Sequence, residues 1–390
     1  MYETSHFQQY RNLHREWARP DFINLNPIQR GGILSEEARK ALLEFGDGYS
    51  TCDWCPPKEA RLDAIEKPPI SSFYQDLAKF LGMDVARVVT RCREAKFIIF
   101  MTMTRPGDII VVDSLAHYST FLAAELAQLE VVEVPNSGPP EFRITPEDYR
   151  AVIERIIKEK GRPPALALLT HVDSHYGNLT DAKKVAEVCH EFNVPLILNA
   201  AYTAGIMPVD GKTIGADFIV SSGHKSWAAS APTGILAMKE EFAEKVLVRS
   251  KRYPNKELAL LGCTVMGAPL LSLMASFPHV TERVKKWDEE IEKARYLVSV
   301  LEQIEGTRQL GIRPKQHTLI HVQSDGFWKV SQQHPRRGYF LYDELKQRRI
   351  VGIQPGLSKH FKLNTYGLSW ENIKYVGDAF LEIAKKYQLL

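Results

Sequence analysis

The stretch that decides the fold is Asp217-Phe218-Ile219-Val220-Ser221-Ser222-Gly223-His224-Lys225. It begins as an apolar run, and a second apolar run, Gly234-Ile235-Leu236-Ala237-Met238, follows a few residues later. This spacing predicts a turn between two buried strands. Small residues before the lysine let backbone approach a ligand, so Lys225 is placed for covalent chemistry rather than for solvation.

Two interpretations of Lys225 remain open from these residues alone. In the first, the lysine forms a Schiff base with pyridoxal 5′-phosphate (PLP), and Ser222, Gly223 and His224 lie beside the cofactor phosphate. In the second, it is a solvated lysine on a surface hairpin, because motifs this short often occur without function. The residues that the fold brings next to this stretch must decide between them.

The composition is that of a large folded protein. Its 390 residues, of which 44% are hydrophobic, can bury a large core and predict more than one domain. The net charge of +3 is small, so any contact with RNA must be local. We expect an N-terminal segment with active-site loops (1–69), a large PLP-binding domain (70–255) and a small C-terminal domain (256–390).

Cysteine usage and hydropathy predict the compartment. The chain has five cysteines, an odd number, and no recognisable secretory leader, which argues against a disulfide framework and for a reducing compartment. No uninterrupted apolar run reaches the roughly 18 residues that a membrane span needs. We therefore expect a cytoplasmic protein with no membrane partner.

From about residue 70 the pattern alternates between helices and short apolar strands. The predicted strands are Arg87–Thr90, Ile109–Val112, Val131–Val134, Ala165–Thr170, Leu196–Asn199 and Phe218–Ser221. This alternation predicts the α/β class, with a mainly parallel sheet covered by helices on both faces. After Met238 the alternation lapses, and helices expected near Glu240–Ser250 and Val280–Leu301 lead into a smaller α+β domain.

Polar residues stand where the predicted strands end. In parallel sheets, ligands bind outside the carboxyl ends of the strands. The residues at these ends are Arg93, His117, Tyr118, His171, Asp173, Asn199 and Lys225. The junction of Cys92 and Arg93 also opens a helix, whose free N–H groups and dipole suit a phosphate. Because all these polar residues are expected at one edge of the sheet, they indicate a binding site rather than unrelated surface positions.

Several motifs in the same order resemble one family, the archaeal O-phosphoseryl-tRNA:Cys-tRNA synthases. The similarity extends from about residue 23 to the end of the chain. The motifs are Asn26-Pro27-Ile28-Gln29-Arg30-Gly31-Gly32, Gly46-Asp47-Gly48-Tyr49-Ser50, Cys52-Asp53-Trp54-Cys55, Arg93-Glu94-Ala95-Lys96-Phe97, Tyr176-Gly177-Asn178-Leu179, Gly215-Ala216-Asp217-Phe218-Ile219-Val220, Ser222-Gly223-His224-Lys225-Ser226 and Gly262-Cys263-Thr264.

This resemblance implies a fold-type I PLP-dependent transferase with a mainly parallel sheet of the seven-stranded type. It implies a homodimer with active sites between subunits, which converts phosphoseryl-tRNA(Cys) to cysteinyl-tRNA(Cys) with a sulfur donor. Phosphoseryl-tRNA synthetase is then a candidate partner. His117 would cover the face of the PLP ring; the alternative is a buried histidine bonded to backbone.

The chemistry of such a replacement accounts for Lys225 and Asn199. Removal of the α-proton is easy only when the negative charge is delocalised into PLP, and Lys225 is the obvious base. Most fold-type I enzymes carry an aspartate where this chain has Asn199. A neutral amide can only hydrogen-bond the ring nitrogen, which favours β-elimination of phosphate and sulfur addition over amino-group transfer.

Three loop cysteines, Cys52, Cys55 and Cys263, are candidates for sulfur chemistry. The C-x-x-C spacing alone is weak; prolines follow Cys55, and no second pair is present for zinc. Together with Cys263, the pair could form a persulfide relay or a three-thiolate iron–sulfur site. We expect Cys189 to lie in the core and Cys92 to act through its backbone at the phosphate loop.

The distribution of arginine indicates the substrate. Enzymes acting on free amino acids usually clamp the α-carboxylate with an arginine of the C-terminal domain, but no arginine follows Arg349 here. An aminoacyl-tRNA carries an uncharged ester instead. Arg30, Arg93 and Tyr118 are then candidates for binding substrate or phosphate, unless Arg30 clamps a free carboxylate.

Two other functions stay open from the sequence. A cysteine desulfurase or β-lyase would act on a free amino acid and would need no tRNA. A binding protein could have kept the fold and lost the chemistry, although the presence of Lys225 argues against this.

Overall fold

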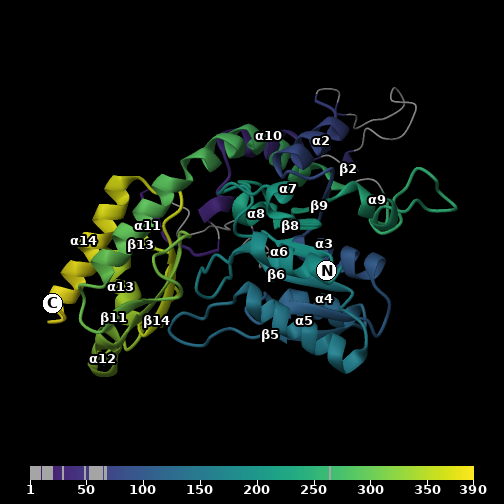
Figure 1. Cartoon of the computed structure of the whole chain (residues 1–390). Helices are drawn as coiled ribbons and strands as arrows, with labels where there is room; N and C mark the ends of the chain where they lie inside the picture. Colours follow the sequence, from purple (N-terminus) through teal and green to yellow (C-terminus); the bar gives the residue numbers. More distant parts are fainter. Residues whose placement is uncertain are drawn as a thin grey trace, which may run out of the picture.

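The computed structural model describes residue 10 and residues 21–28, 30–47, 50–51, 65, 68–262 and 265–390. Cys52, Cys55 and Cys263 lie outside these residues, so the predictions about them are not tested by the structure. Figure 1 shows two groups of elements, one around a central sheet and one at the C-terminal end, with the long helix α10 (Gly267–Arg283) running between them.

The central sheet has seven strands in the order β3-β9-β8-β7-β6-β4-β5. Their bounds are β3 Val85–Val89, β4 Ile109–Asp113, β5 Glu130–Val134, β6 Leu166–Thr170, β7 Leu196–Asn199, β8 Phe218–Ser222 and β9 Gly234–Met238. Strands β5, β4, β6, β7 and β8 pair in parallel, whereas β9 runs antiparallel to both of its neighbours. The predicted mainly parallel sheet is confirmed.

Helices cover both faces of this sheet because its strands are apolar on both sides. Along β6, Leu166 and Leu168 belong to one core cluster, and Ala167 and Leu169 belong to another. The helices of this part are α2 Ile70–Phe80, α3 Cys92–Met103, α4 Tyr118–Leu126, α5 Pro146–Lys160, α6 Ala182–Glu191, α7 Gly211–Ile214, α8 Gly223–Ser226 and α9 Glu240–Val246. Side chains of α3, α4 and α9 fill one cluster, and those of α2, α5 and α6 fill the other.

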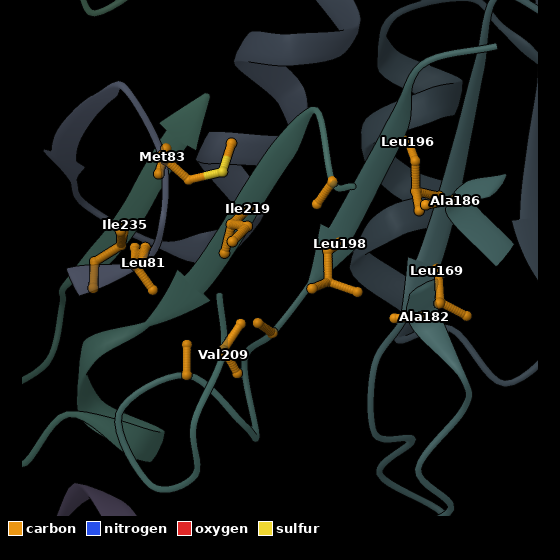
Figure 2. Packing of buried hydrophobic residues seen from close by; sticks show 14 of the residues in the cluster. Leu81, Met83, Leu169, Ala182, Ala186, Leu196, Leu198, Val209, Ile219 and Ile235 are labelled. Carbon is orange, nitrogen blue, oxygen red and sulfur yellow. The ribbon is translucent and has the colours of Figure 1, made fainter. Parts of the chain in front are cut away.

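Figure 2 shows the second of these clusters from close by. Leu169, Leu198 and Ile219 come from the adjacent strands β6, β7 and β8 and point into the same core as Ala182 and Ala186 of α6. All five side chains are buried. The full burial of neighbouring strands fixes their register, and therefore fixes where their carboxyl ends lie.

The C-terminal part is built on a three-stranded antiparallel sheet. Its strands, in the order β11-β12-β14, are Thr307–Leu310, Leu319–Ser324 and His360–Asn364. Its helices are α11 Trp287–Leu301, α12 Asp325–Gln333, α13 Tyr339–Gln347 and α14 Trp370–Lys386. In Figure 1, α11 and α14 lie side by side at the outer edge, and the two helices are in contact.

The N-terminal stretch packs against the C-terminal part rather than standing alone. Strand β1 (Ile23–Asn24) pairs in parallel with β13 (Ile350–Val351), and Leu25 belongs to the C-terminal core cluster. The remaining short elements are η3 Arg30–Gly32, α1 Glu36–Glu44, β2 Ser50–Thr51, β10 Val265–Met266 and η5 Val284–Lys286.

Some elements after Met238 differ from the prediction. Helix α9 ends at Val246 rather than Ser250, and residues 280–286 belong to the end of α10 and to η5 rather than to the start of α11. Helix α10 was missed because Pro278, a residue that usually ends helices, lies inside it. Within the described residues, no helix has both the length and the apolar composition needed to cross a bilayer.

Candidate functional site

A cavity of about 550 Å³ opens at the carboxyl ends of the central strands. Thr170, Asn199 and Ser222, the last residues of β6, β7 and β8, line it. The sequence-predicted residues that also line it are Cys92, Arg93, His117, His224 and Lys225. The fold therefore brings together residues that are far apart in the sequence, at the edge of the sheet where the sequence predicted a ligand.

Five predicted residues that the structure describes are not part of the cavity lining, namely Gly223, Tyr118, Arg30, His171 and Asp173. Gly223 is packed under it, and a Cβ atom there would come within 2.7 Å of the Thr233 side chain. Tyr118 is 57% exposed, with its ring centroid 4.2 Å from that of His117. The Nε atom of Arg30 donates to the carbonyl of Tyr366 at 2.8 Å, and burial lowers the pKa of Arg30 to about 10.

Lys225 lies on the short helix α8, whose backbone is packed closely against the N-terminal stretch. A Cβ atom on Gly32 would lie 1.8 Å from the carbonyl oxygen of His224, and one on Gly31 would lie 2.7 Å from that of Lys225. Only glycine allows this approach, which explains the glycine pair of the motif. The Nζ atom of Lys225 lies 4.6 Å from the ring centroid of Tyr202, a residue that the sequence analysis missed.

The start of helix α3 offers a place for an anion. Its first N–H groups have no acceptor within the helix, and its N-cap residue, Arg91, makes no side-chain capping bond. A Cβ atom on Gly234 would lie 2.6 Å from the Cys92 nitrogen, so β9 passes directly against this turn. Nearby, the buried Nδ1 atom of His224 has no hydrogen-bond partner among the described residues. These donors fit the phosphate of PLP.

His117 caps helix α4 and presents a neutral ring. Its Nδ1 atom accepts from the backbone N–H of Ser119 at 3.2 Å, and the Ser119 hydroxyl lies 2.9 Å from the same atom. The ring proton therefore sits on Nε2. Burial, followed by the positive charges of Lys225 and Lys96, lowers the pKa of His117 to about 4. An uncharged, flat imidazole of this kind suits stacking on an aromatic cofactor.

Lys96 is a buried lysine at the cavity that the sequence analysis did not single out. Its ammonium donates to the hydroxyls of Ser119 at 3.0 Å and Thr120 at 2.6 Å. Burial lowers the pKa of Lys96 to about 8. A lysine inside the apolar run of α3 was the available signal, because lysine is rarely buried without a specific partner. Through Ser119, Lys96 helps to hold His117.

The side-chain oxygen of Asn199 already accepts hydrogen bonds within the protein. Its Oδ1 atom accepts from the backbone N–H of Ala201 at 3.4 Å and from the Cys92 thiol at 3.6 Å. The Nδ2 group is then the donor that remains for a ligand such as a ring nitrogen. Cys92 contributes this thiol, as well as its backbone, and burial raises its pKa. Cys189 lies in the core, as expected.

Comparisons with a family model and with individual proteins agree on the family of this chain. A family model described as "O-phosphoseryl-tRNA(Sec) selenium transferase, SepSecS" matches residues 70–384. A relative from Methanopyrus kandleri, named O-phospho-L-seryl-tRNA:Cys-tRNA synthase, is 54% identical over 98% of both chains. O-phospho-L-seryl-tRNA:Cys-tRNA synthase 2 from Archaeoglobus fulgidus is 56% identical over 94% of this chain and 95% of the relative.

Solved structures agree with these relatives. The structure of a SepCysS–SepCysE N-terminal domain complex has a TM-score of 0.91 and 50% identity, and the match covers 99% of this chain and 100% of that chain. A serine palmitoyltransferase from Sphingomonas wittichii is 17% identical with a TM-score of 0.71, covering 95% of this chain and 88% of that chain. This second likeness shows the fold alone, which is fold-type I of the PLP-dependent enzymes.

Replacing Gly234 with alanine tests the anion site. The added Cβ would collide with the backbone of Arg91 and Cys92, so the start of α3 must move. We expect Gly234→Ala to weaken PLP binding by about tenfold or more, measured by absorbance titration of the apoprotein. Gly107→Ala is a stringent control, because its Cβ would meet nothing within 4 Å, whereas its φ of +83°, unlike the backbone of Gly234, strains an alanine. Unchanged PLP affinity in Gly234→Ala would contradict the assignment.

Proposed function

Because the chain belongs to the family that includes the O-phosphoseryl-tRNA(Sec) selenium transferases and the O-phospho-L-seryl-tRNA:Cys-tRNA synthases, we propose that it converts O-phosphoseryl-tRNA(Cys) to cysteinyl-tRNA(Cys). The observation that carries the proposal is identity above 50% along nearly the whole chain to proteins named for this reaction. The family model is named for selenium transfer, but these full-length relatives are named for cysteine, so we propose sulfur.

The residues at the cavity suit this reaction. When bound, PLP supplies an electron sink for the negative charge left at the α-carbon. Lys225 would hold the cofactor covalently and would also move the α-proton. The neutral His117 ring would cover a face of the bound cofactor, and the Asn199 amide would donate to its ring nitrogen without adding a proton to it. This amide favours β-replacement over amino-group transfer.

The surroundings of the substrate carboxyl group suit an ester. The Nζ atom of Lys362, which lines the cavity, donates to the carbonyl of Ser174 at 3.0 Å. Arg30 donates through Nε to a backbone carbonyl and does not line the cavity. Among the described residues, the arginines that line the cavity are Arg91 and Arg93 of the large domain, and none comes from the C-terminal part, where enzymes of free amino acids usually carry their carboxylate clamp; an uncharged aminoacyl ester needs no such clamp. This supports a tRNA-borne substrate over the free amino acid of a desulfurase or β-lyase.

Exposed aromatic residues beside cations suit the tRNA itself. On the C-terminal part, the Arg336 guanidinium lies 5.7 Å from the ring of Tyr339, and the Lys359 ammonium lies 5.8 Å from the ring of Trp328. Tyr339 and Trp328 are 50% and 41% exposed. Such pairs can contact phosphates and bases together. We propose that this surface contacts the RNA.

The function is tested by comparing phosphoseryl-tRNA(Cys) with free phosphoserine, each with sulfide. We expect kcat/KM to be higher for the tRNA substrate by at least about 100-fold, because remote contacts contribute to the rate. Lys225→Ala should abolish turnover and the borohydride-reducible covalent attachment of PLP, whereas Lys212→Ala, an exposed lysine on α7, should change neither. The affinity for tRNA should fall steeply with added salt.

Comparable turnover of the free amino acid would instead support the desulfurase or β-lyase alternative. Borohydride-reducible covalent attachment of PLP that persists in Lys225→Ala would contradict the role of that lysine.

Cys52, Cys55 and Cys263 are proposed to deliver the sulfur. If one of them carries a persulfide received from a sulfane-sulfur donor, its outer sulfur bonds to the β-carbon of the substrate after phosphate has left that carbon. A second cysteine then attacks the inner sulfur, which closes a disulfide and releases the product thiol. Oxidation of the two cysteines to this disulfide supplies the two electrons that the transfer needs. The alternative is a three-thiolate iron–sulfur site. Within the described ranges, no group of three or more His, Cys, Asp or Glu side chains could hold a metal ion.

Single alanine variants of the three cysteines separate these roles. We expect each variant to bind PLP normally but to lose most sulfur transfer, measured as cysteinyl-tRNA formed from phosphoseryl-tRNA. Cys189→Ala is the control for cysteine loss in general, because Cys189 is buried away from the cavity. Loss of PLP in all three variants would make the cysteines structural, and stoichiometric iron in the anaerobically purified protein would favour the cluster over the relay.

An exposed apolar row supports a homodimer. Tyr118, Leu122 and Leu126 of α4 are 57%, 55% and 68% exposed, and their spacing of four residues puts them on one face of the helix. Met101 of the adjacent α3 is 54% exposed. The row begins next to His117, so a second copy packed here would lie beside the cavity. We propose that this face pairs two chains with their active sites near the interface.

The dimer predicts a specific effect of charge on this face. Leu122→Lys should place two ammonium groups in the interface and shift the protein toward monomer, as measured by sedimentation velocity. Leu390→Lys, which changes an equally exposed leucine at the C-terminus, should leave the dimer intact. A monomeric wild-type protein, or a Leu122→Lys variant that stays dimeric, would show that this face is not the interface.

The similarity to this family also suggests partner proteins. The related solved structure pairs SepCysS with the N-terminal domain of SepCysE, which supports a comparable partner for this chain. Phosphoseryl-tRNA synthetase, which would make the substrate, remains a second candidate.

A further inference from the structure

A second cavity, of about 540 Å³, adjoins the first. Pro27, Ile28, Gln354 and Lys362 line both, so the two spaces meet along a common wall. The second cavity lies on the side of the C-terminal part, where enzymes of free amino acids would place their carboxylate clamp. Nothing in the reaction at the first cavity uses it.

The walls of the second cavity are apolar and aromatic. Val351, Ile353 and Phe361 contribute buried side chains, with exposures of 4%, 3% and 1%. His321 and His360 form a corner, with ring centroids 5.8 Å apart and planes at 87°. Flat apolar walls with ring faces are the surroundings that nucleobases find in proteins that bind single-stranded RNA.

His321, one of the two rings of this corner, is held in place by contacts outside the cavity. His321 stacks on Tyr176 with centroids 5.3 Å apart and planes at 9°, and one of its ring nitrogens, Nδ1, lies 2.8 Å from the carbonyl oxygen of His175. Burial lowers the pKa of His321 to about 4, so its ring is neutral at physiological pH. A preorganised neutral ring loses little entropy when a base stacks on it.

The polar groups at the cavity are few and suit a nucleoside. The Oδ1 atom of Asn26 accepts from the Ile28 N–H at 2.9 Å, which leaves its Nδ2 group as a donor. Gln354 and Lys362 stand at the common wall, and the described lining residues include no Asp or Glu that would repel a phosphate. The site therefore combines an apolar slot with a mildly positive entrance.

We propose that the second cavity binds the 3′-terminal adenosine of the tRNA, with the base against His321 and His360 and the ribose ester at the common wall. This inference rests on the proposed function, since a substrate amino acid in the first cavity is joined through its carboxyl group to that ribose. The common wall is where a chain of atoms must pass from one cavity to the other. The second cavity would then hold the carboxyl side of the substrate through its adenosine, as an arginine clamp does through a free carboxylate.

Two hydrolysis-resistant substrates test the inference on the intact holoenzyme with sulfide. One is the phosphoseryl amide of 3′-amino-3′-deoxyadenosine, and the other is phosphoserine methylamide; both have an uncharged carboxyl group, and only the first has a nucleoside. We expect KM for the adenosine compound to be about tenfold lower. In His360→Ala this advantage should disappear while turnover of the methylamide is unchanged, and His360→Phe, which keeps a ring, should retain it.

The outcomes separate this inference from the function on which it rests. Equal KM values for the two amides in the wild type, or an advantage that persists in His360→Ala, would overturn it and leave the cavity to a small sulfur compound or to a partner protein. Turnover of phosphoseryl-tRNA without turnover of the adenosine amide would overturn it alone. Failure of phosphoseryl-tRNA itself to react would overturn the proposed function, and the inference with it.

Discussion

Arg283 of helix α10 joins the segments that present Lys225, and the geometry of the site depends on this guanidinium. Its Nε atom donates to the carbonyl of Gly205 at 2.8 Å, and its Nη2 atom donates to those of Gly31 at 2.9 Å and Ser226 at 2.6 Å. These carbonyls belong to the N-terminal stretch, to the connection after β7 and to helix α8. Burial lowers the pKa of Arg283, but a guanidinium remains charged and its bonds are charge-assisted.

The cavity is strongly cationic for a site inside a protein of small net charge. Arg91, Arg93, Lys96 and Lys225 all line it. Burial, followed by repulsion from neighbouring positive charges, lowers the pKa values of Lys96 and His117. A cofactor phosphate and a substrate phosphate would both relieve this repulsion. The same field keeps His117 neutral, so one arrangement of charges serves both anion binding and ring stacking.

The sequence predicted best those parts of the site that follow from local pattern. The apolar strands placed Asn199, Lys225 and the start of α3 at one edge, because the carboxyl ends of parallel strands must coincide. Lys96, Tyr202 and Arg283 were missed because their importance comes from partners distant in sequence. Helix α10 was missed because Pro278 contradicts the local rule, while tertiary packing keeps the helix continuous.

The motif Tyr176-Gly177-Asn178-Leu179 can be explained only from the three-dimensional structure. Gly177, with φ of +66°, leaves room for the Leu319 carbonyl, since a Cβ atom would lie 2.2 Å from that oxygen. The adjacent Asn178 accepts from the Ile312 N–H at 2.7 Å, and the buried Lys315 ammonium donates to the Tyr176 carbonyl at 2.7 Å. This motif therefore joins the loop after β6 to the C-terminal part, and it positions the Tyr176 ring under His321.

The contacts between the Tyr176–Asn178 loop and the C-terminal part explain how two cavities can act on one substrate. The chemistry of the first cavity is fixed by the central sheet, whereas the walls of the second come from the N-terminal stretch and the C-terminal part. A substrate spanning both would contact elements that the Tyr176–Asn178 loop, Arg283 and the β1–β13 pairing help to hold in register. Selection for an aminoacyl ester over a free amino acid then needs no repulsive group. It follows from the two cavities together, because a substrate that reaches from the first cavity into the second gains contacts there that a free amino acid cannot make.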